Sequence, residues 1–448
     1  MKKLIQTLKN IWSIDELRSK IIFTLALVAI YVLGTKIVLP GIDPSKLSDG
    51  GGADSGVLGL INTFSGGAFH QQSIFALGIM PYISASIFMQ LMTVLVPSFQ
   101  KMQKEGESGR KKINQYTRYL TVVVTILQAS AYVTYIRSLN QGNGAMLPAF
   151  GPYFWLCSIF LLTAGTLFVM WMGEKITDKG LGNGTSLIIM IGILQRLPRS
   201  LAQELSAKSV RNGQVLMFII EIAVLIAIIM GCVMLIQGVR KVPVNYAKQI
   251  VGNRNFGGSG LRQFLPLKVN SAGVMPIIFA QAIIFIPTII ANYNVDKGSG
   301  LLSALNDHSN IWYMLIYSVV VIGFTFLYTA LIFNPKQIAD NLKQSNGFIP
   351  GVKPGQPTAD YIGTIMDRIT LPGAILLALV GILPGIAQRL GVTSQFSTFF
   401  GGTSLLIMVG VILDTLQAIE TQLLMRNYDT LMKSGRIQGR QTTSAVQM

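Results

Sequence analysis

Charged side chains are scarce in this 448-residue chain. They make up 12% of it, whereas hydrophobic residues make up 51%. A soluble protein of this size carries about twice that share of charge. Because long apolar runs recur from one end of the chain to the other, the composition excludes an ordinary soluble globular protein and indicates a polytopic helical membrane protein.

Cysteine and histidine are nearly absent. Cys157 and Cys232 both lie inside apolar runs, which indicates small core residues rather than a disulfide or a thiolate metal site. The two histidines, His70 and His308, lie far apart in the sequence. We therefore expect neither a metal nor a cofactor.

Motifs for nucleotide and peptide hydrolysis are also missing. The sequence contains no Gly-Lys dipeptide, which excludes the common phosphate-binding loop, and no His-Glu-x-x-His. Residues 257–260 (GGSG) resemble the serine motif of intramembrane proteases, but they lie in a polar, basic stretch, where flexible glycines are the better interpretation. No catalytic residue is predicted, so we do not expect an enzyme.

Few ionisable groups lie within the apolar runs. Glu221, Asp414 and Glu420 fall near the ends of their runs. An ion-coupled secondary transporter, the first alternative we consider, usually needs such groups near the middle of the membrane. A second alternative is an insertase without a pore. The polar residues near the middle of the runs are Gln90, Gln128 and Gln281.

The apolar runs predict an all-α fold of ten transmembrane helices. Ten helices divide into two halves of five, and inverted, pseudo-symmetric halves often frame a central pathway. No sequence repeat between the halves is evident, so the symmetry rests on the number of helices alone. The expected spans are Ile21–Leu33, Ser73–Val96, Tyr119–Ile136, Phe154–Met172, Thr185–Leu197, Val215–Gly238, Ala272–Ala291, Ile311–Phe333, Leu371–Ile386 and Thr398–Leu424.

The stretch from Val57 to Val96 predicts a broken helix. Its first piece, Val57–Phe69, is too short to cross a bilayer, which takes about 20 residues, and its second, Ser73–Val96, is long enough. Broken backbone at membrane depth survives only inside protein or beside a water-filled cavity. The pattern therefore fits a pore or binding cavity and, equally, a short external loop helix followed by an ordinary span.

The basic residues predict that both ends of the chain are cytoplasmic. With the N-terminus placed inside, 27 of the 36 Lys and Arg residues fall in inside segments and 9 in outside segments. This asymmetry follows the positive-inside rule. The predicted organisation is an amphipathic segment at 1–20 on the membrane surface, a first half at 21–198, a second half at 199–425 and a cytoplasmic tail at 426–448.

Two long inside loops, 239–270 and 334–368, predict a basic docking surface for an acidic protein face or ribosomal RNA. Anionic lipids are a further expected partner of so basic a membrane protein, whose net charge is +17. The candidate docking residues are Arg240, Lys241, Lys248, Arg254, Arg262, Lys268, Lys336, Lys343 and Lys353.

Several long motifs resemble the SecY family, the channel subunits of the bacterial protein-translocation complex, over nearly the whole chain. Between the expected spans and in order, the matching stretches read LPGID at 39–43, FSGGA at 64–68, FALGIMPYISASI at 75–87, KEGESGRKKINQYTRY at 104–119, GEKITDKGLGNGTS at 173–186, NYAK at 245–248, LPLKVN at 265–270, YTALIFNPKQIADNL at 328–342 and FGGTSLLI at 400–407. The resemblance implies a protein-conducting channel of the bacterial cytoplasmic membrane that translocates unfolded secretory polypeptides and releases membrane segments laterally into lipid.

The resemblance also implies roles for particular residues. The half-helix at about 57–69 would be a plug, and a ring of isoleucines would form the constriction. A lateral gate would lie between spans two and three and spans seven and eight. The implied plug residues are Leu58, Leu60, Ile61, Phe64, Ser65, Gly66 and Gly67, and the implied ring residues are Ile79, Ile83, Ile189, Ile193, Ile278 and Ile407.

The implied partners are the subunits SecE and SecG, the motor ATPase SecA, the ribosome, signal sequences and unfolded polypeptides. Lys353 stands where many family members carry Arg, and Lys cannot make the planar bidentate contact of Arg. This departure bears on the affinity for partners rather than on the channel.

Overall fold

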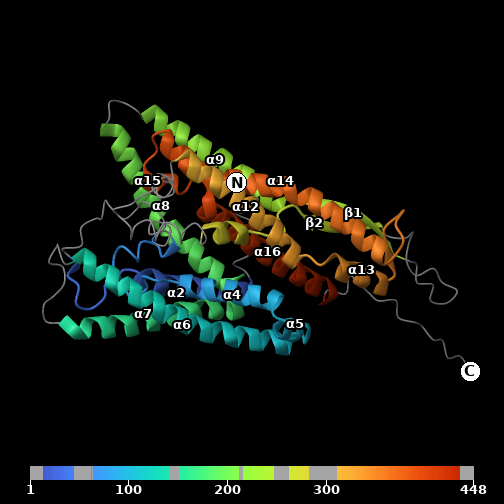
Figure 1. Ribbon diagram of the computed structural model, residues 1–448, viewed down its shortest axis with the longest axis horizontal. Coiled ribbons are helices and arrows are strands. Elements are labelled where there is room, and N and C mark those ends of the chain that lie inside the picture. The colour runs from blue at the N-terminus through green and yellow to red at the C-terminus, as the bar shows by residue number, and fades with distance from the viewer. Residues whose placement is uncertain are drawn as a thin grey trace, which may run out of the picture.

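A computed structural model describes residues 14–44, 62, 64–140, 151–210, 215–246, 262–281 and 310–433. Most of the predicted surface segment at 1–20 and most of the tail at 426–448 lie outside these ranges. Within them the chain is mainly helical, as expected (Figure 1).

The helices form two groups with one helix between them. In Figure 1, α2 and α4 to α7 gather on one side, α9, α12, α14 and α16 gather on the other, and α8 lies between the groups. The bounds are α2 Asp15–Gly34, α4 Met80–Leu95, α5 Pro97–Lys104, α6 Glu107–Asn140, α7 Gly151–Lys179, α8 Gly184–Val210, α9 Val215–Gln237, α12 Ile311–Ile332, α13 Pro335–Gln344, α14 Gln356–Arg389, α15 Ser394–Ser397 and α16 Gly402–Lys433.

Seven helices in the described part of the chain are long and apolar enough to cross a membrane. An eighth candidate is the pair formed by α4 and α5, which is bent by 99°. The expected span Thr185–Leu197 lies in α8, which continues through the predicted division of the halves at 198/199. Only the first part of the expected span Ala272–Ala291 is described, and it is helical at 275–281. Ten spans and inverted symmetry therefore stay a prediction.

The predicted helix Ser73–Val96 is wrong in its first seven residues. Residues 73–79 form turns, and α4 begins at Met80. Gly78 adopts φ +53°, which glycine tolerates and most residues do not, and Pro81 occupies the first turn of α4, where its missing N–H costs nothing. Both residues favour a helix that starts here rather than seven residues earlier.

The helix α4 is short, and a compact segment at 64–79 precedes it. Sixteen residues span about 24 Å, less than the roughly 30 Å of a bilayer core. Ala68, Phe75 and Ala76 of the turn segment are buried in protein. This is the setting in which broken backbone is tolerated at membrane depth.

The fold also contains a small antiparallel sheet, so the expectation of an all-α fold is wrong at this point. The strands β1 (Val239–Tyr246), β2 (Arg262–Lys268) and β3 (Gly347–Phe348) form a sheet in the order β2-β1-β3. Val242 pairs with Leu265, and β3 pairs only with the last two residues of β1. The sheet occupies the segments that we interpreted as loops.

This sheet has an apolar core of its own. Alternate residues of β1, Val242 and Val244, point into it, as a period of two requires. Leu342 of α13 and Ile362 of α14 close the core from the other side. We call the unit of β1, β2, β3, α13 and the first turns of α14 the platform; its own core makes it a folded unit rather than a pair of loops.

Candidate functional site

One apolar cluster joins helices from both groups. It contains residues of α2, α7, α8, α14, α15 and α16 together with parts of the turn segment before α4. We call it the central cluster; its buried members are Leu27, Tyr31, Phe64, Phe75, Ile79, Val169, Met172, Ile176, Leu187, Ile188, Ile189, Ile193, Ala387, Val392, Phe396, Phe399, Phe400, Ile407 and Val411.

The central cluster brings together four of the six ring candidates. Ile79, Ile189, Ile193 and Ile407 are buried members. Ile83 is half-buried and packs against the same cluster. The four buried isoleucines come from the start of α4, from α8 and from α16, so residues far apart in the sequence meet around one apolar region.

The sixth ring candidate lies apart from the buried members. Ile278 is half-buried in the helical stretch at 275–281 and is not among the residues of the central cluster. Of its neighbours, Val274 packs against that cluster. The motif at 274–279 therefore contacts the central cluster through Val274, which was not among the ring candidates chosen from the sequence.

Four plug candidates are described. Phe64 is a buried member of the central cluster, and Ser65 and Gly66 are buried beside it. Gly67 is half-buried, and its N–H donates to the carbonyl of Asn62 at 2.8 Å. Leu58, Leu60 and Ile61 lie outside the described residues.

Polar groups inside the segment at 62–70 hold its compact shape. The Ser65 hydroxyl donates to the Asn62 carbonyl at 3.2 Å and accepts from the Phe69 N–H at 3.2 Å. The Asn62 side chain accepts from the His70 N–H at 3.2 Å. From α6, the Tyr132 hydroxyl donates to the Phe69 carbonyl. The segment is thus a preformed unit rather than a loose loop.

A glycine of α8 forms the seat of this segment. A Cβ atom added to Gly192 would lie 2.6 Å from the carbonyl oxygen of Phe64 and 3.3 Å from the amide nitrogen of Gly66. Gly66 itself has φ +69° and lies against the backbone of Gly192. Only a glycine lets the two backbones approach so closely. Sequence reasoning missed Gly192, whose only signal was a small residue beside Ile193.

The helices α4 and α12 meet at a seam of one hydrogen bond and a small apolar cluster. The Tyr328 hydroxyl of α12 donates to the Gln90 side-chain oxygen of α4 at 3.0 Å. The apolar contact around this bond includes Phe279, which stacks on Phe324 with 5.7 Å between ring centroids. Gln90, one of the three polar residues near the middle of the apolar runs, bonds across this seam.

The platform presents most of the basic docking candidates to solvent. Its described elements carry more Lys and Arg than Asp, and the Lys353 side chain projects from a tight turn. Gly351 and Gly355 flank that turn with φ +85° and +102°, and the Thr358 hydroxyl donates to the Lys353 carbonyl at 2.8 Å. The exposed candidates are Arg240, Lys241, Lys268, Lys336, Lys343 and Lys353. The backbone of Arg262 lies in β2, whereas Lys248 and Arg254 lie outside the described residues.

Comparison with known proteins gives a consistent result. Residues 73–416 match the SecY family. A relative from Mycobacterium bovis, the protein translocase subunit SecY, is 43% identical over 437 residues, which cover 93% of this chain and 97% of the relative. The protein translocase subunit SecY of Corynebacterium glutamicum is 42% identical over 97% of this chain and the whole of the relative.

Solved structures share the fold. In one solved structure, the plug domain of the SecY protein is described as stabilising the closed state of the translocation channel and maintaining a membrane seal. That structure superposes on this chain with a TM-score of 0.60 and 16% identity, and the match covers 90% of this chain and 92% of that one. The idle yeast Ssh1 complex bound to the yeast 80S ribosome gives a TM-score of 0.59 and 15% identity, covering 90% and 89%.

Proposed function

Because this chain belongs to the SecY family of protein translocase subunits, we propose that its central cluster is the seal of a protein-conducting channel in a bacterial cytoplasmic membrane. The chain is a multi-pass membrane protein and a translocation-channel subunit. The observation that carries the proposal for the seal is the burial of isoleucines from α4, α8 and α16 around Phe64.

The chemistry of the cluster suits a seal for a polypeptide channel. A constriction of branched apolar side chains excludes water and ions by dewetting. Such side chains offer no fixed ligand, so any translocating sequence is tolerated. When a chain enters, Ile79, Ile189, Ile193 and Ile407 would line it, with Ile83 and Ile278 at the margin.

The segment at 62–70 would be the plug that supports the closed state. Its own hydrogen bonds keep it compact, and its glycines let it fit against α8. A compact unit can leave the cavity as a whole, which favours reversible opening. Because the basic residues place the loop before α4 outside, the plug would close the seal from the outer side.

The seam between α4 and α12 would be the lateral gate. It would release membrane segments of client proteins sideways into lipid, while soluble clients pass through the seal. A single hydrogen bond between Gln90 and Tyr328 suits an interface that must open and close, because its net contribution is modest.

Replacing Tyr328 by Phe is expected to favour the open gate. The variant keeps the tilted ring contact with Phe279 but loses the donor to Gln90, which is worth about 1 kcal/mol net. Export of a client with a defective signal sequence should therefore rise roughly fivefold. Ser318→Ala, which removes a hydroxyl bonded within α12 itself, is the matched control and should export like the wild type. Equal export by Tyr328→Phe and wild type would remove this bond from the gate.

The platform would dock the partner that supplies the energy. Its exposed Lys and Arg residues suit an acidic face of SecA or ribosomal RNA. The yeast relative bound to a ribosome supports this assignment. We also propose SecE and SecG as partner subunits, anionic lipids at the cytoplasmic surface, and both chain ends in the cytoplasm.

Purified channel in proteoliposomes is expected to translocate an unfolded client with SecA and ATP, and Lys353→Glu is expected to reduce that rate at least tenfold. Reversing an interfacial charge is worth a few kcal/mol when its partner is left unpaired. Higher salt should weaken SecA binding to the wild type, because salt screens the charges at the interface. Arg137→Glu, the same charge change on the predicted outer side, should translocate normally. Failure of the wild type to translocate would refute the channel, whereas normal rates for Lys353→Glu would refute only the docking role.

A further inference from the structure

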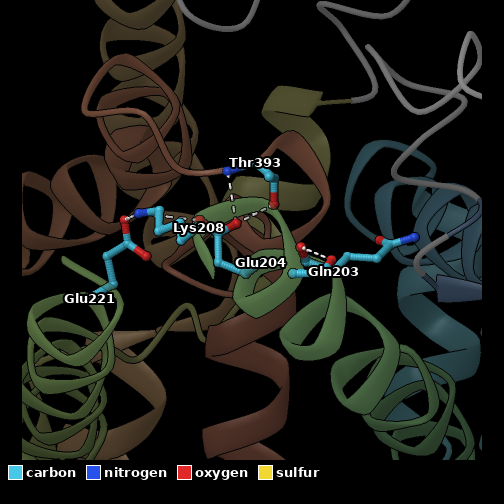
Figure 2. A network of polar contacts seen from close by, with 6 residues as sticks. Gln203, Glu204, Lys208, Glu221 and Thr393 are labelled. Carbon is cyan, nitrogen blue, oxygen red and sulfur yellow. Dashed lines mark hydrogen bonds and ion pairs between the residues drawn. The ribbon is translucent and has the colours of Figure 1, made fainter. Parts of the chain in front are cut away.

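Two buried charged side chains and a third that is 11% exposed meet where α8 packs on α9. Lys208 of α8 pairs with Glu204 on the same helix at 3.3 Å and also with Glu221 of α9. The Glu204 side chain is fully buried, and that of Lys208 is 9% exposed. Figure 2 shows Lys208 between the two carboxylates. Charges buried to this degree are expensive unless they are paired, so their presence calls for a role.

A fourth residue reaches this group from a distant part of the chain. The Thr393 N–H donates to Glu204 Oε2 at 3.0 Å, and the Thr393 hydroxyl donates to the same oxygen (Figure 2). Thr393 occupies the N-cap position of α15, where a Thr hydroxyl ordinarily accepts from the helix it begins. It makes no such cap bond here. The side chain is therefore directed to Glu204 instead of to its own helix.

Thr393 precedes α15, which carries Phe396 of the central cluster and leads directly to Phe400 of the same cluster. The Ser397 N–H donates to the Thr393 carbonyl at 2.9 Å. Between them, Phe396 is fully buried and packs edge-to-face on Phe400, with 5.2 Å between ring centroids. Both phenylalanines share the central cluster with Ile193.

The helix α8 carries both ends of this arrangement. Ile193 and Glu204 lie on it about 16 Å apart along the axis. One continuous helix therefore holds a residue of the proposed seal and the anchor of the phenylalanines that pack on it. Any change in the Glu204–Thr393 contact shifts α15 relative to Ile193.

We propose that Glu204 is a positioning residue of the seal, which holds Thr393 and α15 so that Phe396 and Phe400 close on the central cluster. The proposal rests on the proposed function of that cluster. Lys208 forms ion pairs with Glu204 and Glu221, and so balances the charge of the Glu204 side chain. The closed channel depends on this contact although none of its polar atoms lies within the apolar cluster.

The test compares Thr393→Val with Thr393→Ser in the full-length protein reconstituted in liposomes. Valine has the shape of threonine but lacks the hydroxyl donor, whereas serine keeps it. Resting ion flux per channel should rise about tenfold in Thr393→Val and stay at the wild-type level in Thr393→Ser. Adding Glu204→Gln to Thr393→Val should raise the flux no further than the more severe single change, because both break one contact.

Thermal unfolding of each variant separates a positioning role from a structural one. A Thr393→Val channel that unfolds at a lower temperature but is as tight as the wild type would overturn the proposal, as would equal leaks from the Val and Ser variants. If the single changes prevent insertion, Glu204→Gln combined with Lys208→Met removes a carboxylate and an ammonium together, and it should leak in the same way; a tight double variant would overturn the proposal.

Ile407→Asn serves as the positive control for the seal. A leak from Ile407→Asn without one from Thr393→Val would reject the positioning role and leave the proposed function standing. No leak from Ile407→Asn would reject the proposed seal, and the positioning role with it.

Discussion

Replacing Ile407 by Asn is expected to raise the resting ion leak of the channel roughly thirtyfold. Ile407 is buried in the central cluster beside residues of α8 and α15. Asn loses the apolar contact and places an amide that binds water in the seal, which weakens the closed state by about 2 kcal/mol. Because each 1.4 kcal/mol changes an equilibrium constant tenfold, the open fraction rises roughly thirtyfold. Ion flux into liposomes measures the leak, and export of a client with a defective signal sequence should improve in parallel.

Two variants control for the effect of position and of size. Ile412→Asn changes a more exposed residue of the same helix and should leave the channel tight. Ile407→Leu keeps the apolar volume and should leak little. A tight Ile407→Asn channel that remains folded in the membrane would reject the proposed seal.

Replacing Gly192 by Ala is expected to unseat the plug and raise the leak at least about fivefold. The new methyl group would lie 2.6 Å from the Phe64 carbonyl oxygen, which is backbone and cannot rotate away. Overpacking of this kind costs about 1–3 kcal/mol, and here the cost falls on the closed state alone. In an open helix position the same change would stabilise the helix by up to about 1 kcal/mol. Ion flux measured beside thermal unfolding distinguishes the two effects.

Gly323→Ala in α12 and Gly410→Ala in α16 are the matched controls. A Cβ atom at either position meets nothing within 4 Å. Both variants should stay tight and unfold at or slightly above the wild-type temperature. If Gly192→Ala behaves like them, the close approach of α8 and the segment at 62–70 plays no part in closure.

Long apolar runs were sufficient to predict the bounds of α9 and α12. The expected spans Val215–Gly238 and Ile311–Phe333 differ from α9 and α12 by one residue at their C-terminal ends. In these runs nothing competes with the helix, because a membrane leaves the backbone no other partner. The start of α4 was different, since hydropathy continues through Ser73–Ile79 and the break is marked by the backbone conformation of Gly78 and by Pro81 in the first turn of the helix.

The strands and the seat of the plug needed the tertiary structure. The alternation at Val242 and Val244 was a signal for β1, but it is short and lies among basic residues, which favoured a loop. Gly192 acquires its role only when Phe64 lies against it, and Glu204 only when Thr393 does. Through the family motifs, the sequence did predict that distant isoleucines meet, whereas contacts outside those motifs, such as these two, were not predicted.

The length of α14 has a mechanical consequence. Its 34 residues run without interruption for about 50 Å, from the platform at Gln356 to the turn that precedes Thr393. If a partner docks on the platform as proposed, a load that it applies at one end of α14 reaches the other end along a single rod-like helix. Pro372 and Pro384 remove hydrogen bonds within this rod, so any bending under load will concentrate at these two points. The positions of Pro372 and Pro384 therefore set the direction in which the C-terminal end of α14 moves.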